Sequence, residues 1–166
     1  MRKLYTIGYE GADLSAFVAT LKAAKTSTLL DVRELPISRR KGFSKNALKD
    51  ALAEVGIDYR HERQLGSPRD MRHRLRDDWN YKRFFKDFDK HLNQQSELIE
   101  QLADELRGNV ALMCFEKDHS QCHRTPVVDA LAKLVNKTPV HLGVDNDKWQ
   151  TQQAAHLDIS QGVSAA

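Results

Sequence analysis

The segment MCFEKDHSQCHRTP, residues 113–126, concentrates side chains that can do chemistry between an apolar stretch and a helix start. It contains two cysteines, two histidines, two acids and an arginine. A thiol can attack a substrate or bind a metal, an imidazole can move a proton, and a guanidinium can hold a phosphate or carboxylate with parallel hydrogen bonds. The segment is therefore a catalytic loop, a metal site or a polar connection, and its surroundings must distinguish these.

The two cysteines of this segment differ in their surroundings. Cys114 ends an apolar stretch, where a free cysteine is most often a small buried residue. Alternatively, the helix that follows would lower the pKa of its thiol and make it a nucleophile. Cys122 is surrounded by polar residues, so we expect it to be exposed and to act as a resolving thiol or a ligand. His123 can move a proton, and Glu116 can act as a base or orient an arginine. The catalytic candidates are Cys114, Glu116 and His123.

A metal site in this segment would use Cys114, His119, Cys122 and His123, with Glu116 as an oxygen ligand. Zinc accepts all of these residue types. The cysteines are eight positions apart, however, and lack the C-x2-C pairing that is typical of structural zinc sites. We therefore expect neither a metal ion nor another cofactor.

The composition predicts one soluble domain. The chain has 166 residues, 40% of them hydrophobic, which suits a single core. No apolar run reaches the length of a membrane helix, and the apolar part of MRKLYTIGYE is too short for a secretory signal, so we expect a cytoplasmic protein without membrane contact. Two cysteines do not form a disulfide framework, and a reducing compartment would keep them as thiols. The sequence predicts no particular oligomeric state.

Two periodicities predict the elements that position these residues. Short β-branched or aromatic stretches predict five strands: KLYTIGY (3–9), STLLDVRE (27–34), IDYRHE (57–62), NVALMCFE (109–116) and PVHLGV (139–144). Asp13 and Ser44 can each cap a helix with apolar residues at helical spacing, and Gly56 can end the second. Strands joined by helices through short connections predict a single three-layer α/β domain over residues 1–144, with helices on both faces of a mostly parallel sheet of about five strands.

The remaining segments carry weaker patterns. Residues 65–78 contain turn residues and many charges without a clear period, so we interpret them as a long excursion, which is typical of a functional region. Apolar residues recur with helical spacing over 79–107, which fits one long helix or two. Thr125 followed by Pro126 predicts the start of another helix. Residues 145–166 are polar and patternless, and we expect them to form a flexible tail.

The carboxyl ends of the predicted strands bring charged and reactive residues to one edge of the sheet. Ligands of open parallel sheets bind at this edge, where helix N-termini also point. Several arginines would repel one another there unless an anion binds between them, although Asp31 and Arg33 alone could form a structural ion pair. We therefore predict a pocket for an anion of the phosphate or nucleotide type, lined by Tyr9, Asp31, Arg33, Ser38, Arg39, Arg40, Cys122 and Arg124.

A basic segment indicates an alternative function. Residues 60–76 contain six arginines and two acids, although the net charge of the whole chain is only +3. Such a segment could bind nucleic acid, with Trp79 and Tyr81 stacking on bases. Alternatively, it could be a solvated surface, and these two rings would then pack against the start of a helix. The candidates are Arg60, Arg63, Arg69, Arg72, Arg74 and Arg76. The expected partner is thus an anionic small molecule or a nucleic acid.

Four blocks of the sequence resemble a known family. TIGY (6–9), DVRELPISRR (31–40), YRHERQLG (59–66) and CFEKDHSQCHR (114–124) are similar to the pattern of the DUF488 proteins, a bacterial and archaeal group of unassigned function. The resemblance runs from Tyr5 to about Leu142 and implies an α/β fold. It implies no particular reaction, so it leaves both an enzyme and a binding protein open.

A more local likeness concerns the first cysteine. TLLDVRE (28–34) is similar to a strand that opens many rhodanese domains, in which a later strand ends in a catalytic cysteine, and Cys114 occupies the corresponding place. Rhodanese and cysteine-phosphatase loops are short and usually contain glycine, whereas no glycine lies between Cys114 and Pro126. This likeness implies a third function, that of a thiol enzyme acting in sulfur transfer or dephosphorylation through Cys114.

Overall fold

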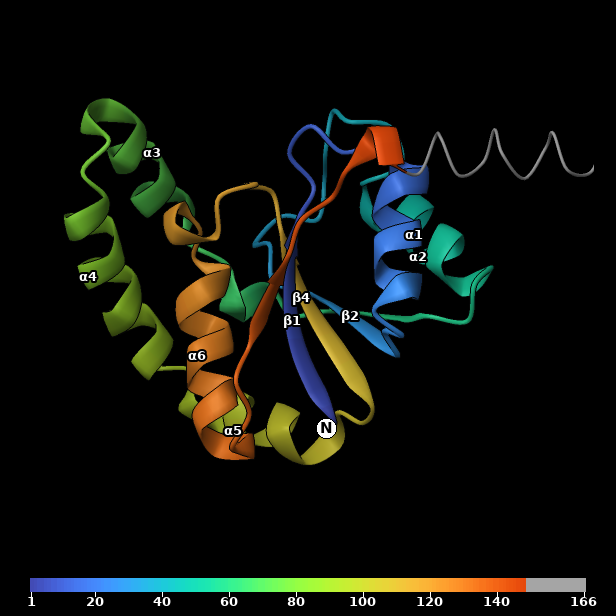
Figure 1. Cartoon of the computed structure of the whole chain (residues 1–166). Coiled ribbons are helices and arrows are strands. Elements are labelled where there is room, and N and C mark those ends of the chain that lie inside the picture. Colours follow the sequence, from blue (N-terminus) through green and yellow to red (C-terminus); the bar gives the residue numbers. More distant parts are fainter. Residues whose placement is uncertain (149–166) are drawn as a thin grey trace, which may run out of the picture.

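The computed structural model describes residues 1–148 of the 166-residue chain. These residues form a five-stranded, fully parallel sheet with the order β3-β2-β4-β1-β5 (Figure 1). The strands are β1 (Lys3–Gly8), β2 (Thr28–Asp31), β3 (Asp58–His61), β4 (Asn109–Cys114) and β5 (Val140–Leu142). The predicted α/β domain with a parallel sheet of about five strands is confirmed.

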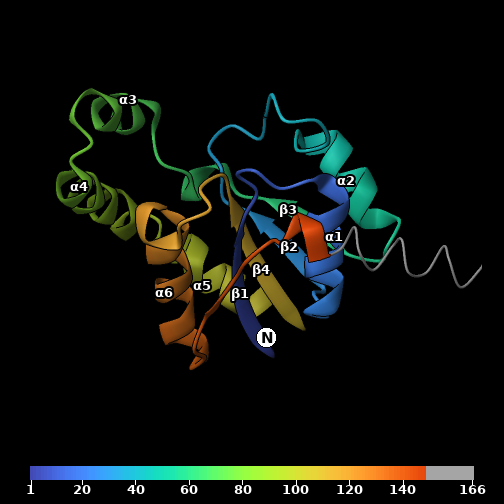
Figure 2. The same ribbon diagram turned by 45° about the horizontal axis from the view of Figure 1, so that its top comes forward.

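Helices cover both faces of the sheet (Figures 1 and 2). They are α1 (Leu14–Ala23), α2 (Lys45–Ala53), α3 (Arg69–Asp78), α4 (Tyr81–Asn93), α5 (Ser96–Glu105) and α6 (Arg124–Val135). Phe17 of α1 and Leu48 of α2 belong to the core on one face, together with Met113 of β4. Helices α4, α5 and α6 build the core on the other face, where Val110 and Leu112 of β4 contribute. Successive strand residues point to opposite faces, so the central strand β4 serves both cores.

The connections place a crevice at the carboxyl end of β4. The chain leaves β1 and β2 toward the face that α1 and α2 cover, whereas it leaves β4 toward α6 on the opposite face. Adjacent strands whose connections diverge in this way open a crevice, which is the usual ligand site of an open parallel sheet. Cys114 is the last residue of β4 and lies at this point.

Residues 65–78 are largely helical, and our expectation of an irregular excursion is wrong. Helix α3 spans ten residues and follows a short 3-10 turn, Arg63–Leu65. None of the residues of α3 is fully buried, and its apolar side consists only of Met71 and Leu75, which is too narrow a stripe to predict the helix. Trp79 joins α3 to α4 in the left-handed conformation, with φ 52°. Figures 1 and 2 show α3 and α4 beyond α6, with α3 at the level of the carboxyl ends of the strands.

The other helix boundaries refine the predictions. The stretch 79–107 contains two helices, α4 and α5, which is one of the two expected arrangements. Helix α6 begins at Arg124 and not at the predicted Thr125, because the Thr125 hydroxyl donates a hydrogen bond to the carbonyl of His119 and His123 takes the N-cap position. Asp13 and Ser44 do occupy the N-cap positions of α1 and α2.

The predicted C-terminal tail is only partly described. The side chain of Asn146 accepts a hydrogen bond from the backbone N–H of Asp13 and donates one to the carbonyl of Gly11, so this part of the chain contacts the start of α1. The rest of the expected tail, 149–166, lies outside the described residues. None of the helices within residues 1–148 is long and apolar enough to cross a membrane.

Candidate functional site

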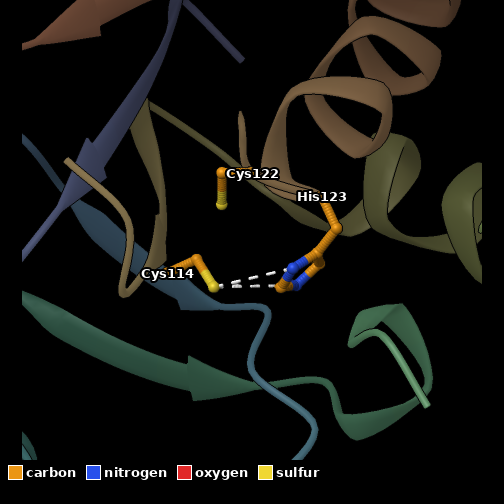
Figure 3. Close-up of side chains that lie close together, drawn as sticks. All are labelled: Cys114, Cys122 and His123. Carbon is orange, nitrogen blue, oxygen red and sulfur yellow. Dashed lines mark hydrogen bonds between the residues drawn. The ribbon is translucent and has the colours of Figure 1, made fainter. Parts of the chain in front are cut away.

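Three reactive side chains meet at the end of β4. Cys114, Cys122 and His123, each at most 5% exposed, bring their sulfur and nitrogen atoms within 4.8 Å of one another (Figure 3). We call them the cysteine–histidine cluster. The Sγ of Cys114 lies 3.7 Å from Nδ1 of His123 and 3.8 Å from its Nε2. The turn before α6 folds Cys122 inward to 0% exposure, so the expectation that Cys122 is exposed is wrong.

Hydrogen bonds from the neighbouring backbone orient the cysteine–histidine cluster. Nε2 of His123 lies 2.8 Å from the carbonyl oxygen of Val32. A carbonyl can only accept, so Nε2 carries the hydrogen, and in a neutral imidazole the lone pair is then on Nδ1, 3.7 Å from the sulfur of Cys114. The backbone N–H of Arg124 donates to the sulfur of Cys122 over 3.4 Å, because the first N–H groups of a helix have no partner within the helix.

Burial makes both thiols poor acids. It raises the pKa of Cys114, and a hydrogen bond with Cys122 only partly opposes this rise. Burial also raises the pKa of Cys122 well above its usual value, and the hydrogen bond with Cys114 adds to the effect. Burial alone would lower the pKa of His123, but its contact with Cys122 outweighs that and leaves the pKa raised. A nucleophilic cysteine needs a lowered pKa, and burial shifts the pKa of both thiols in the opposite direction.

A buried arginine fixes the loop that follows Cys114. Arg124, 1% exposed, donates hydrogen bonds to the carbonyls of Glu116 and Lys117. The Glu116 carbonyl also lies against Gly8, which is the partner of Cys114 in the β1–β4 register, and a side chain at position 8 would overlap it. The loop is thereby held with one carboxylate oxygen of Glu116 buried, and this oxygen has no hydrogen-bond partner among residues 1–148.

Arg33, which follows the end of β2, forms a buried ion pair with Asp31. Its guanidinium donates two hydrogen bonds to the Asp31 carboxylate, at 2.9 and 2.7 Å, and two more to the Tyr9 hydroxyl and the Phe43 carbonyl. Arg33 is 5% exposed and Asp31 0% exposed. Tyr59 donates to the same carboxylate over 2.5 Å, and burial together with this bond raises the pKa of Tyr59. The structural ion pair that the sequence left open for Asp31 and Arg33 is therefore present.

Two adjoining hollows of about 270 Å³ each open in front of the cysteine–histidine cluster. We call them together the strand-end cleft, and they share the lining residues Ser67, Arg72, Arg76, Phe115, Glu116 and His123. The other lining residues of one hollow are Tyr9, Arg33, Glu34, Leu35, Ile37 and Cys114. Those of the other hollow are Glu10, Leu75, Trp79, Tyr81, Phe84 and Gln121. The cleft thus lies between the strand ends and the α3–α4 pair, and it contains carboxylates as well as arginines.

Arg40 and its neighbours lie away from this cleft. Arg40 donates to the carbonyl of Ala12 and to the carboxylate of Asp13 at the start of α1. With Lys41 it lines a separate hollow of about 790 Å³, whose lining residues include no cysteine or histidine. Arg39 is exposed and, like Ser38 and Arg40, is not a lining residue of the strand-end cleft. We place the candidate site in the smaller cleft, because it contains the cysteine–histidine cluster.

The six arginines of the basic segment also separate in space. Four of them lie outside the cleft: Arg60 pairs with Glu62 and Glu105, Arg74 pairs with Asp87, Arg69 contacts His73, and Arg63 is exposed. Arg72 and Arg76, one turn apart on α3, line both hollows of the cleft. The sequence assigned these two to nucleic-acid binding and not to the pocket, because their helix was not predicted.

Arg72 and Arg76 differ in their partners. Arg72 pairs with Glu34 at 3.1 Å and also donates to the carbonyl of Ser67. Arg76 is exposed, and its side chain makes no hydrogen bond or ion pair with any residue in the described part of the chain. Ser67 and Phe115, which also line the cleft, carried no signal in the sequence, because a serine and an aromatic residue next to a turn are common in any α/β protein.

His119, which the sequence offered as a further metal ligand, lies apart from the cysteine–histidine cluster. Although it has H-x3-H spacing with His123, its ring stacks on that of His141 with 3.6 Å between the centroids. The cysteine–histidine cluster therefore contains only one histidine, His123. Burial and the positive charges of His119 and Arg124 lower the pKa of His141.

These features define a parallel α/β domain in which connections diverge around a central strand that ends in a buried cysteine–histidine cluster. The family model described as "Domain of unknown function DUF488" matches residues 13–131. The chain belongs to this family, as the sequence blocks predicted. Comparisons with curated proteins and with solved structures give no match, and the local likeness to rhodanese domains is not shown.

Proposed function

We propose that this chain binds an anionic ligand of the nucleotide type in the strand-end cleft. The observation that carries the proposal is Arg76, which lines both hollows and makes no ion pair within residues 1–148. A guanidinium binds phosphate or carboxylate oxygens with two parallel hydrogen bonds. Arg72 lies one turn earlier on the same helix and lines the same cleft, so both side chains can contact one anion.

Exposed aromatic side chains beside these arginines favour a ligand that also carries a planar ring. Trp79 is 60% exposed and Phe115 is 45% exposed, and both line the cleft together with Tyr81. Aromatic side chains of this kind provide stacking platforms for bases, worth about 1–3 kcal/mol per base. A nucleotide would contact the arginines through its phosphates and the aromatic side chains through its base.

Arg33 and Arg124, which the sequence also predicted for the pocket, have a different role. Arg33 donates four hydrogen bonds to Asp31, Tyr9 and Phe43. Arg124 donates two to the loop after β4, and its buried Nε has no hydrogen-bond partner within residues 1–148. Both guanidiniums are buried, and Arg124 is not a lining residue of the cleft. We assign to them the positioning of the cleft wall, and to Arg72 and Arg76 the contact with the ligand's charge.

Isothermal titration with nucleoside phosphates and with inorganic phosphate tests this function. Arg76→Ala should weaken nucleotide binding about tenfold or more, because hydrogen bonds to charged groups contribute about 1.5–3 kcal/mol. Trp79→Ala should weaken nucleotide binding but leave the binding of inorganic phosphate unchanged.

Arg74→Ala is the matched control for this titration. It removes the same charge from the same helix, but Arg74 pairs with Asp87 and does not line the cleft. Equal losses in the two arginine variants would mean a general effect of charge and would contradict a specific site. Tight binding of single-stranded oligonucleotides alone, with a steep dependence on salt, would instead support the nucleic-acid alternative.

A further inference from the structure

The cysteine–histidine cluster has the donor atoms and the spacing of a metal site. Two sulfur atoms and one imidazole nitrogen lie within 4.8 Å of one another although their residues come from two separate elements (Figure 3). Zinc–sulfur bonds of about 2.3 Å and zinc–nitrogen bonds of about 2.0–2.1 Å in a tetrahedron put neighbouring donor atoms about 3.5–3.8 Å apart. The Sγ of Cys114 and Nδ1 of His123 are 3.7 Å apart.

The imidazole of His123 is held in the tautomer that a metal needs. Its Nε2–H donates to the carbonyl oxygen of Val32 at 2.8 Å, which fixes the ring and leaves the lone pair of Nδ1 beside Cys114. Histidine ligands of metals almost always donate their other ring N–H to a carbonyl, a carboxylate or water. This bond is therefore the outer-sphere support expected for an Nδ1 ligand.

Two further features lie next to the cysteine–histidine cluster, although Glu116 is not one of the three residues whose donor atoms lie together. The backbone N–H of Arg124 donates to the sulfur of Cys122, a bond that stabilises a thiolate ligand. On the cleft side, the carboxylate of Glu116 has a buried oxygen without a hydrogen-bond partner within residues 1–148. A buried acceptor of this kind costs free energy unless it finds a donor or a cation.

We propose that Cys114, Cys122 and His123 bind one divalent, thiophilic metal ion, zinc in the first place, with the fourth position facing the strand-end cleft. Zinc replaces the two thiol protons, which leave as H⁺, so two thiolates and one neutral imidazole hold Zn²⁺ without any change of oxidation state. Catalytic zinc sites combine three protein ligands with an open fourth position in the same way. The proposal does not depend on the proposed binding of a nucleotide.

Metal analysis of the full chain tests the site directly. Protein produced with zinc and purified without chelators should contain about one zinc per chain. After exchange into cobalt, the same protein should show thiolate-to-cobalt charge-transfer absorption and the visible bands of a tetrahedral ion. A wild-type chain that stays metal-free after reconstitution and gives no cobalt spectrum overturns the proposal. A count of free thiols in that chain would show whether a Cys114–Cys122 disulfide takes its place.

Single substitutions assign the ligands. Cys114→Ser, Cys122→Ser and His123→Gln should each lose the bound zinc, and the cobalt spectrum of the cysteine variants should lose thiolate intensity. His119→Gln is the matched control, because His119 is close in sequence but stacks on His141 outside the cluster, and it should keep a full complement of metal. Retention of zinc by all three ligand variants, with their helical circular dichroism intact, would place the metal elsewhere and reject the site.

Discussion

The carbonyl of Glu116 occupies the space that a side chain at Gly8 would need. Gly8 is the register partner of Cys114, so the close approach of Gly8 and Glu116 sets the path of the loop directly after Cys114. Arg124 donates a hydrogen bond to the same carbonyl, and its guanidinium also lies next to Gly8. The absence of a side chain at Gly8 therefore leaves room for the Glu116 backbone and the Arg124 guanidinium.

Gly8→Ala should destabilise the protein and displace this loop. The new methyl group would overlap backbone, which cannot swing away, and overpacking of this kind costs about 1–3 kcal/mol. Urea unfolding measures the loss, and the zinc content of the folded variant reports whether the cluster has moved. Gly143→Ala is the control, because a side chain there meets no atom within 4 Å. Equal stability of the two variants would contradict the close approach.

Asp31→Asn should lower the free energy of unfolding more than most single substitutions do. It leaves the buried Arg33 guanidinium without its counter-charge, and breaking one side of a buried ion pair costs about 3–5 kcal/mol. Glu105→Gln breaks the Arg60–Glu105 pair, whose side chains are 30% and 45% exposed, and should lower the free energy of unfolding far less, because solvent screens an exposed pair. Denaturant unfolding of both variants checks the difference. Similar losses would mean that the Asp31–Arg33 pair contributes no more than a surface pair.

His141 should make stability fall as the solution becomes acidic. Its pKa is lowered in the folded protein by burial and by the positive charges of His119 and Arg124, against the opposing charge of Asp129. The unfolded chain then binds more protons below the usual histidine pKa of about 6.5, so stability is present above that value and is lost as pH falls through it. The Thr6 hydroxyl, 2.6 Å from Nδ1, is a neutral partner and adds no charge.

His141→Asn removes the titrating group and keeps a polar partner for Thr6. The free energy of unfolding of this variant should decrease less than that of the wild type between about pH 7.5 and about pH 5.5. Comparing the two proteins cancels the contribution of titrating groups that do not interact with His141; His119, Arg124 and Asp129 do interact with it. Parallel pH profiles would show that His141 has the same pKa in the folded and unfolded chains.

The sequence by itself determined the parts of this protein that depend on local pattern. Alternating apolar stretches and turn residues predicted the five strands, and Cys114 was correctly placed at the end of a central strand. Four short sequence blocks also identified the family. A strand or helix that buries one face has apolar residues at a regular spacing in the sequence. This spacing does not depend on which element packs against that face, so it can be recognised locally.

Only the tertiary structure decided how the polar residues pair. Cys122 lies in a polar stretch, yet a turn buries it against Cys114. Arg33 forms an ion pair with Asp31, whereas Arg76 makes no ion pair within residues 1–148. Helix α3 brings Arg72 and Arg76 to the cleft although its apolar side is too narrow to have predicted the helix. Charges and thiols carry no sequence period, and their partners depend on distances that exist only after the sheet and its two helical layers have packed.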